Sequence, residues 1–209
     1  IDDEGKPKRI GRSERRALGA FYTPEPLVRR VVDLVSNAMP SLSVAPPEPL
    51  RVCDPACGSG NFLVGVARAF ADTRRGVLLE GVDLDPLAAW AAEVALSCEQ
   101  ARCGMSFRIR SGDALVGRSH GCRHDESLAR ETGTPPTPWE HPFDLVIGNP
   151  PFLGQLSGNT VRSRALAKYL RDASDGAISG YADAAAAFLW KSITLASNGG
   201  VIAMILPRS

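Results

Sequence analysis

Residues 144–152, DLVIGNPPF, join an apolar run to a polar, proline-containing end. The apolar part is typical of a strand that is buried on both faces of a sheet. It is followed by Asn149, Pro150, Pro151 and Phe152. Consecutive prolines end a strand, remove backbone donors and fix φ, so the carbonyl groups just before them leave the sheet without a local donor. The sequence therefore predicts a rigid cluster of hydrogen-bond acceptors beside an aromatic ring.

Such a cluster suits chemistry on an amino group that is conjugated to a heteroaromatic base. That amino group is a poor nucleophile, because its lone pair is delocalised into the ring. If the Asn149 side-chain oxygen and the Pro150 carbonyl each accept one of its hydrogens, electron density builds on nitrogen and the lone pair turns toward an electrophile. Phe152 would stack on the base and hold it. The alternative is a strand that merely ends in a proline turn.

Three aspartates, Asp54, Asp83 and Asp113, follow one another at intervals of about one strand-helix unit. Each is expected at or just beyond the carboxyl end of a strand, and in an open parallel sheet these ends line the crevice where ligands bind. There Asp83 can bind both hydroxyls of a ribose, and Asp113 can accept from an adenine amino group. A turn residue or helix cap is the alternative for each aspartate alone, but three on one edge favour a ligand site.

The loop that Asp54 opens, DPACGSGNF, contains Gly58 and Gly60, which permit close approach of the backbone to a ligand. It differs from the dinucleotide-binding fingerprint, because Leu63 stands where the third glycine belongs and a carboxylate would repel a pyrophosphate. The loop therefore favours a cofactor with a cationic end over a nicotinamide dinucleotide. Cys57 within it is interpreted as a small packed residue rather than a nucleophile.

Alternating strand and helix patterns are expected to position these residues. Strands are predicted at 50–54, 77–84, 105–115, 143–148 and 201–207, and helices at 23–39, from 62, from 86 and at about 182–197. This repetition predicts an α/β fold, a Rossmann-like and mostly parallel doubly wound sheet that is truncated after the fifth strand. The last strand, wholly apolar, is expected to be buried. Asn-Gly-Gly at 198–200 is expected to close the preceding helix, and a polar loop is expected after Phe152.

Two helices carry specific predictions. The first is expected to begin with Thr23 as N-cap and Pro24 at the first helical position. Its predicted inward face is Leu27, Val28, Val31, Val35, Ala38 and Met39. The helix after the loop 56–61 is expected to bury Phe62, Leu63, Val66, Ala67 and Phe70. Asp85 and Pro86 are expected to open a further helix whose inward residues are Leu87, Trp90, Ala91, Val94 and Cys98.

Composition sets limits on the partners and the compartment. The 209 residues are 44% hydrophobic and 22% charged with a net charge of +1, as in an ordinary globular domain without a global basic field. Five cysteines fit no disulfide framework and favour reduced thiols in a cytoplasmic compartment. The charged N-terminus lacks the apolar segment of a signal peptide, and no apolar run approaches the length of about 18 residues that a membrane span needs. No membrane partner is therefore expected.

Five stretches in this order resemble one family: GAFYTP (19–24), DPACGSGNFL (54–63), GVDLDP (81–86), GDAL (112–115) and IGNPPF (147–152). They resemble the gamma-class amino-methyltransferases that modify adenine N6 in DNA, the modification enzymes of restriction and related phage-defence systems. The resemblance extends from residue 19 to about 207. It implies a methyltransferase catalytic domain at 19–209 with S-adenosylmethionine as its cofactor. Residues 1–18 are then a flexible basic arm, and 117–142 an irregular insertion.

The resemblance also implies roles for particular residues. Thr23 and the loop residues Asp54, Ala56, Gly58 and Gly60 would hold the methionine part of the cofactor. Asp83 would bind its ribose and Asp113 its adenine, and the neighbouring Leu84 and Ala114 complete the expected cofactor-binding set. Asn149, Pro150, Pro151 and Phe152 would hold the target base. Asp83 stands where many members carry Glu, and Phe152 where Tyr is common.

The implied substrate is double-stranded DNA, and a specificity or nuclease subunit or domain is a further expected partner. Cytosine N4, a guanine amino group of RNA or a glutamine amide of protein are alternative acceptors, because Asn-Pro-Pro-aromatic serves planar amino groups and amides generally. A noncatalytic fragment that binds the cofactor is an alternative of another class. The cationic side chains Arg162, Arg164, Lys168 and Arg171 either form a solvated helix face or contact phosphate. No metal site is expected, because His120, Cys122 and His124 have no fourth ligand at a suitable spacing.

Overall fold

The computed structural model describes residues 23–39, 48–71, 76–116, 139, 142–151, 161–178 and 184–206. Predictions on other residues, including the arm 1–18, Phe152, the three residues weighed as a metal site and most of the insertion 117–142, lie outside the described part. Of that insertion, Trp139 is buried and packs edge-on against Phe143, with ring centroids 5.5 Å apart.

The described strands form one parallel sheet, in the order β3-β2-β1-β4-β5. They are β1 Leu50–Asp54, β2 Val77–Asp83, β3 Ser106–Ser111, β4 Phe143–Gly148 and β5 Ala196–Met204. The chain runs outward from β1 to β3 and then returns to place β4 on the other side of β1. The strand order therefore reverses beside β1, and open α/β sheets bind ligands at such a reversal. The predicted fold class is confirmed.

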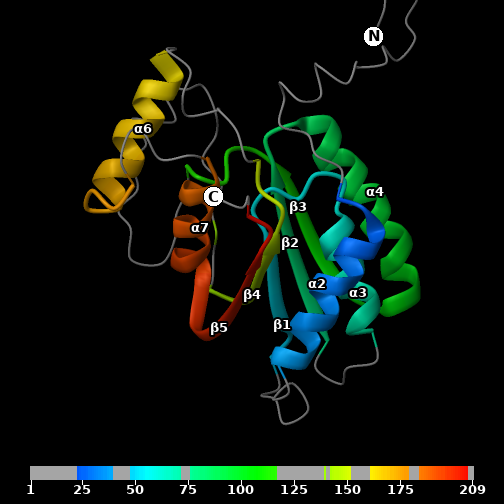
Figure 1. The fold of residues 1–209 in the computed structure, drawn as a ribbon. Coiled ribbons are helices and arrows are strands. Elements are labelled where there is room, and N and C mark those ends of the chain that lie inside the picture. The colour runs from blue at the N-terminus through cyan, green and yellow to red at the C-terminus, as the bar shows by residue number, and fades with distance from the viewer. Residues whose placement is uncertain are drawn as a thin grey trace, which may run out of the picture.

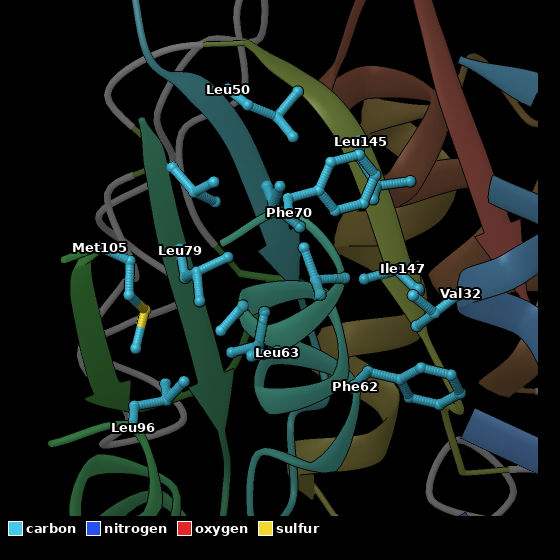
Figure 2. Packing of buried hydrophobic residues seen from close by; sticks show 14 of the residues in the cluster. Val32, Leu50, Phe62, Leu63, Phe70, Leu79, Leu96, Met105, Leu145 and Ile147 are labelled. Atoms are coloured by element: carbon cyan, nitrogen blue, oxygen red, sulfur yellow. The ribbon is translucent and has the colours of Figure 1, made fainter. Parts of the chain in front are cut away.

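Helices cover both faces of the sheet (Figure 1). α2 Glu25–Ala38, α3 Asn61–Ala69 and α4 Pro86–Cys103 lie on one face, and α6 Val161–Ala173 and α7 Ala184–Leu195 lie on the other. Each face encloses its own cluster of buried apolar side chains. Figure 2 shows the first cluster, whose members include Leu63 of α3, Leu79 of β2 and Leu145 of β4. The predicted inward stripe of α3 is confirmed, since none of its five residues is more than 4% exposed.

The start of α2 differs from the prediction. Pro24, not Thr23, is the N-cap, and no side chain caps the helix. Thr23 is buried just outside the helix, where its polar atoms have partners in other elements. The buried face is Val28, Val32 and Val35, whereas Leu27 is 42% exposed.

The inward face predicted for α4 was wrong, although Asp85 and Pro86 open this helix as expected. Leu87, Trp90 and Val94 are exposed, and the buried residues are Ala89, Ala92, Leu96 and Glu99. The reason is steric: a Cβ at Gly60, in the loop before α3, would lie 3.1 Å from the Ala92 Cβ, so α4 turns its small residues toward that loop. Hydrophobicity alone does not report this requirement for close approach.

Two boundaries near the C-terminal end also differ. α6 occupies residues for which a polar loop was predicted. β5 begins at Ala196, directly after α7, so Asn-Gly-Gly at 198–200 lies within the strand instead of closing the helix. The pairing of β5 with β4 is irregular there, with a register shift between Phe143 and Leu145. Because β5 is an edge strand of the described sheet, its residues are half-buried or exposed rather than buried as predicted.

Candidate functional site

Four of the predicted site residues lie along one edge of the sheet. Asp54 ends β1, Asp83 ends β2, Asp113 follows β3 by two residues, and Asn149 follows β4 directly. The strand order therefore places them in the sequence Asp113, Asp83, Asp54, Asn149 across four adjacent parallel strands. The expectation that the three aspartates share one edge is confirmed, and Asn149 lies at the same edge. The reversal of strand order falls between Asp54 and Asn149.

The loop from β1 to α3 forms a backbone cradle at this edge. Gly60 has φ 83° and Gly58 φ 52°, both in the left-handed region that favours glycine. The Cys57 N–H donates to the Val82 carbonyl at 2.9 Å, which fastens the loop to β2. A Cβ at Gly58 would meet nothing within 4 Å, so the backbone there borders open space. A ligand can approach the Gly58 backbone from that side.

Asp83 holds this cradle in place. One carboxylate oxygen, Oδ2, accepts from the Gly58 N–H at 2.8 Å, and Oδ1 accepts from the Asp85 N–H at 2.9 Å. Burial raises the pKa of Asp83, and these two donors oppose the rise. A carboxylate offers about four lone-pair positions, so Asp83 keeps capacity for a pair of ligand hydroxyls. Leu84, the next residue, is 40% exposed beside it.

Asp54 is a buried carboxyl group between the cradle and β4. Its side chain is 1% exposed, and Oδ1 accepts from the Ala56 N–H at 3.0 Å. A Cβ built on Gly148 would lie 2.6 Å from the same oxygen, so only a glycine at the end of β4 leaves room for it. Burial raises the pKa of Asp54 to about 8, the Ala56 N–H opposes the rise, and the negative charge of Asp83 adds to it.

Asp113 lies at the far end of the row, in the turn after β3. Its Oδ1 accepts from the Leu115 N–H at 3.0 Å, while the neighbouring Gly112 N–H donates to the Asp83 carbonyl at 2.9 Å. The second hydrogen bond ties this turn to the end of β2. Asp113 is half-buried and Ala114 is buried. The turn that carries Asp113, the residue expected to bind adenine, and its neighbour Ala114 is therefore fastened to Asp83.

Asn149 lies where β4 leaves the sheet. Its Nδ2 donates to the Thr23 Oγ1 at 3.1 Å, while its buried Oδ1 has no hydrogen-bond partner among the described residues. Pro150 is buried and Pro151 half-buried. A buried amide oxygen without a donor is costly, so this oxygen is an acceptor that a ligand N–H can satisfy.

Two residues of this site were not predicted from the sequence. Asn61, the first residue of α3, donates from Nδ2 to the Thr23 carbonyl at 3.3 Å and so fixes Thr23 beside Asn149. Gly148 provides the space that Asp54 occupies. Asn61 directly follows the glycine loop and Gly148 directly precedes Asn149, so adjacency to the motifs was the available signal.

Cys57 is confirmed as a packed residue. It is 5% exposed, and burial raises the pKa of its thiol, which disfavours the thiolate form that a nucleophile needs. No group of His, Cys, Asp and Glu side chains in the described residues can hold a metal ion. Within that same part of the chain, no helix is both long and apolar enough to cross a membrane.

A family model described as N-6 DNA Methylase matches residues 8–209. The chain belongs to the N-6 DNA methylase family. Curated relatives of this N-6 DNA methylase chain include the type II methyltransferase M.CvrRI of Paramecium bursaria Chlorella virus XZ-6E, 26% identical over 151 residues, which are 72% of this chain and 29% of the relative. The type I restriction enzyme MjaIX methylase subunit of Methanocaldococcus jannaschii is 28% identical over 140 residues, 66% of this chain and 20% of the subunit. The N-6 DNA methylase chain thus spans less than a third of the length of these relatives.

A similar solved structure is that of the type I restriction-modification methyltransferase subunit from Streptococcus thermophilus. It has a TM-score of 0.59 at 19% identity, over 90% of this chain and 34% of the subunit. A class I S-adenosylmethionine-dependent methyltransferase from Listeria monocytogenes has a TM-score of 0.52 at 16% identity, over 93% of this chain and 53% of the other. Both likenesses support the Rossmann-like fold of this N-6 DNA methylase chain.

Proposed function

We propose that this site transfers a methyl group from S-adenosylmethionine to the N6 amino group of an adenine in DNA. The observation that carries the proposal is the Asn149 Oδ1, a buried acceptor without a partner among the described residues, at the end of β4 and one strand from the Asp54 cradle. Family membership supports the same reaction.

The donors and acceptors at the edge of the sheet fit S-adenosylmethionine. Its ammonium group suits the buried acidic Asp54, its ribose diol suits Asp83, and the open backbone at Gly58 leaves room for it. Asp113 and Leu84 then lie at the adenine end, with an acceptor and an exposed apolar side chain. When bound, the cofactor supplies an electrophilic methyl group on a sulfonium.

Asn149 prepares the target amino group for attack. Its Oδ1 accepts one amino hydrogen, and the Pro150 carbonyl accepts the other. The nitrogen lone pair is then directed at the methyl carbon. The cofactor would supply the methyl group from a sulfonium, whose sulfur can leave with the electron pair of the S–C bond, and the alkylated nitrogen would release its proton to solvent. Pro151 keeps the backbone rigid, and Phe152 is proposed to stack on the base.

The substrate is proposed to be a flipped base of double-stranded DNA, because an amino group inside a duplex cannot reach a buried amide. A relative named as a type I restriction enzyme methylase subunit supports a place in a restriction-modification system with a specificity subunit as partner. Lys168 and Arg171, both exposed on α6, are cations available for phosphate contact.

The test uses the protein expressed from its complete reading frame, unmodified DNA and S-adenosylmethionine that carries a labelled methyl group. We expect label in DNA and N6-methyladenine in the nuclease digest, and loss of both with Asn149→Ala. Asn198→Ala, which changes an exposed asparagine of β5, is the matched control and should retain activity. Label in N4-methylcytosine, in RNA or in protein would assign the same chemistry to an alternative acceptor. Cofactor binding without transfer to any acceptor would indicate a noncatalytic module.

A further inference from the structure

We propose that Thr23 is a positioning residue, which sets the Asn149 carboxamide so that its oxygen faces the target amino group. The inference rests on the proposed function and adds a role for Thr23 besides the cofactor contact that the family resemblance implies. The motivating contact is the 3.1 Å hydrogen bond from the Asn149 Nδ2 to the Thr23 Oγ1. The contact spans 126 residues of sequence and joins the segment before α2 to the end of β4.

Contacts with other elements fix the position of Thr23. It is 6% exposed, and its carbonyl accepts from the Asn61 side chain. The next residue, Pro24, accepts from the N–H groups of the first turn of α2. α2 is itself packed closely on α3, since a Cβ at Gly65 would lie 2.9 Å from the Val28 Cγ1. Contacts with two helices therefore fix the Thr23 backbone, and with it the place from which the hydroxyl meets Asn149.

The orientation of the amide decides which ligand it can accept. The oxygen and nitrogen ends of a carboxamide have nearly the same shape, so rotation exchanges an acceptor for a donor at one place. A hydroxyl can pair with either end, but only the observed orientation leaves Oδ1 free for a ligand N–H while Nδ2 keeps a partner. Without the hydroxyl, presentation of Oδ1 would leave the Nδ2 group unsatisfied.

This arrangement makes Thr23 relevant to substrate class. A pocket that presents the Asn149 Oδ1 accepts the amino group of adenine or cytosine, and it repels the carbonyl oxygen of a keto base in the same place. The hydrogen bond to the Thr23 hydroxyl lowers the free-energy cost of holding the Asn149 Oδ1 toward the base, and Thr23 itself does not contact the reacting atoms. The role predicts an effect on the methyl-transfer step rather than on cofactor affinity alone.

The first experiment compares Thr23→Val with Thr23→Ser in the full protein at saturating S-adenosylmethionine. Thr23→Val keeps the shape but removes the hydroxyl, so kcat should fall about tenfold, equivalent to about 1.4 kcal/mol. Thr23→Ser keeps the hydroxyl and should restore kcat to within about twofold of the unsubstituted protein. If Thr23 acts through the cofactor alone, Thr23→Val will raise the cofactor Kd and leave kcat unchanged, which overturns the proposal.

A second experiment does not depend on turnover. The side-chain NH2 resonance of Asn149 in a ¹⁵N-correlated NMR spectrum is assigned as the one that Asn149→Ala removes. It should shift in Thr23→Val and stay near its place in Thr23→Ser and in Asn198→Ala, an exposed asparagine elsewhere. An unmoved resonance in folded Thr23→Val would refute the contact.

The two experiments separate failure of this inference from failure of the proposed function. If the protein methylates no DNA but the Asn149 resonance shifts in Thr23→Val, the contact between Thr23 and Asn149 is supported and the proposed reaction is refuted. Thr23→Ala is the second variant if Thr23→Val does not fold, because it removes the same hydroxyl with a smaller side chain and carries the same expectations.

Discussion

Asp54→Asn is expected to change how the stability of the protein depends on pH. The substitution is nearly isosteric and keeps an oxygen that can accept from the Ala56 N–H, the contact that Oδ1 makes at 3.0 Å. What it removes is the ionisable proton of a side chain that is 1% exposed. Any difference in pH dependence between the two proteins therefore reports the titration of Asp54.

The sign follows from the raised pKa. Burial moves the pKa of Asp54 from 3.8 to about 8 in the folded protein, whereas in the unfolded chain it returns to its ordinary value. Between these values the folded state binds more protons than the unfolded state, so stability falls as pH rises. The contribution is fully present below the ordinary pKa and is lost as pH rises through about 8. At 1.36 kcal/mol per pH unit, the loss from pH 5 to pH 7 is about 2.7 kcal/mol.

Urea unfolding of both proteins at several pH values from about 5 to 8 measures this difference. Asp83 is present in both proteins, so its own raised pKa largely cancels from the comparison. We expect the free energy of unfolding of Asp54→Asn, relative to the unsubstituted protein, to rise steadily across this range. Asp33→Asn, which changes an exposed aspartate of α2, should show no such trend. A difference that stays constant with pH would refute the account of Asp54 as a buried, protonated carboxyl.

Three further predictions follow from the same contacts. Because a cationic ligand favours the ionised form of Asp54, the affinity for S-adenosylmethionine should rise with pH up to about 8. The proton released on binding can be measured by calorimetry in buffers of different ionisation enthalpy. Equal proton release by Asp54→Asn would contradict this prediction. Gly148→Ala would place a Cβ 2.6 Å from the Asp54 Oδ1. We therefore expect the free energy of unfolding to fall by about 1–3 kcal/mol and titration to show weaker cofactor binding. A variant in which neither quantity changes would refute the contact. Leu96→Ala should lower the free energy of unfolding by about 2–5 kcal/mol, because Leu96 is buried. Trp90→Ala, at a position 60% exposed on the same helix, should lower it by about 0.5 kcal/mol or less. The reverse order in urea unfolding would support the inward face of α4 that the sequence predicted.

The edge of the sheet could be predicted from the sequence because its signals are local. A buried strand is marked by an apolar run, and the polar residue that follows it, such as Asp83 or Asn149, falls at the carboxyl end whatever the rest of the chain does. Parallel pairing then gathers those ends on one edge. The Gly loop after Asp54 could be recognised on the same basis, since positive φ restricts the residue type.

The contacts between distant elements could not be predicted in this way. Thr is a residue type that often caps helices, but the Thr23 hydroxyl accepts a hydrogen bond from Asn149, 126 positions away in the sequence. No local sequence pattern predicts that contact. The prediction of the inward face of α4 was wrong, because close approach to Gly60 favours a small residue, Ala92, over Trp90 on the buried side. A hydrophobicity pattern instead favours Trp90 over Ala92 at a buried position. Asn-Gly-Gly after α7 reads as a helix stop but serves here as an irregular start of β5.

We propose that the Asn149 oxygen activates an adenine amino group beside a bound S-adenosylmethionine. The most direct test is mass analysis of nucleosides from DNA that has been incubated with the cofactor and the protein expressed from its complete reading frame. We expect N6-methyladenine with the unsubstituted protein and none with Asn149→Ala, although both should bind the cofactor with similar affinity. N6-methyladenine at an undiminished rate from Asn149→Ala would contradict the account, as would a folded, cofactor-bound protein that leaves adenine unmodified.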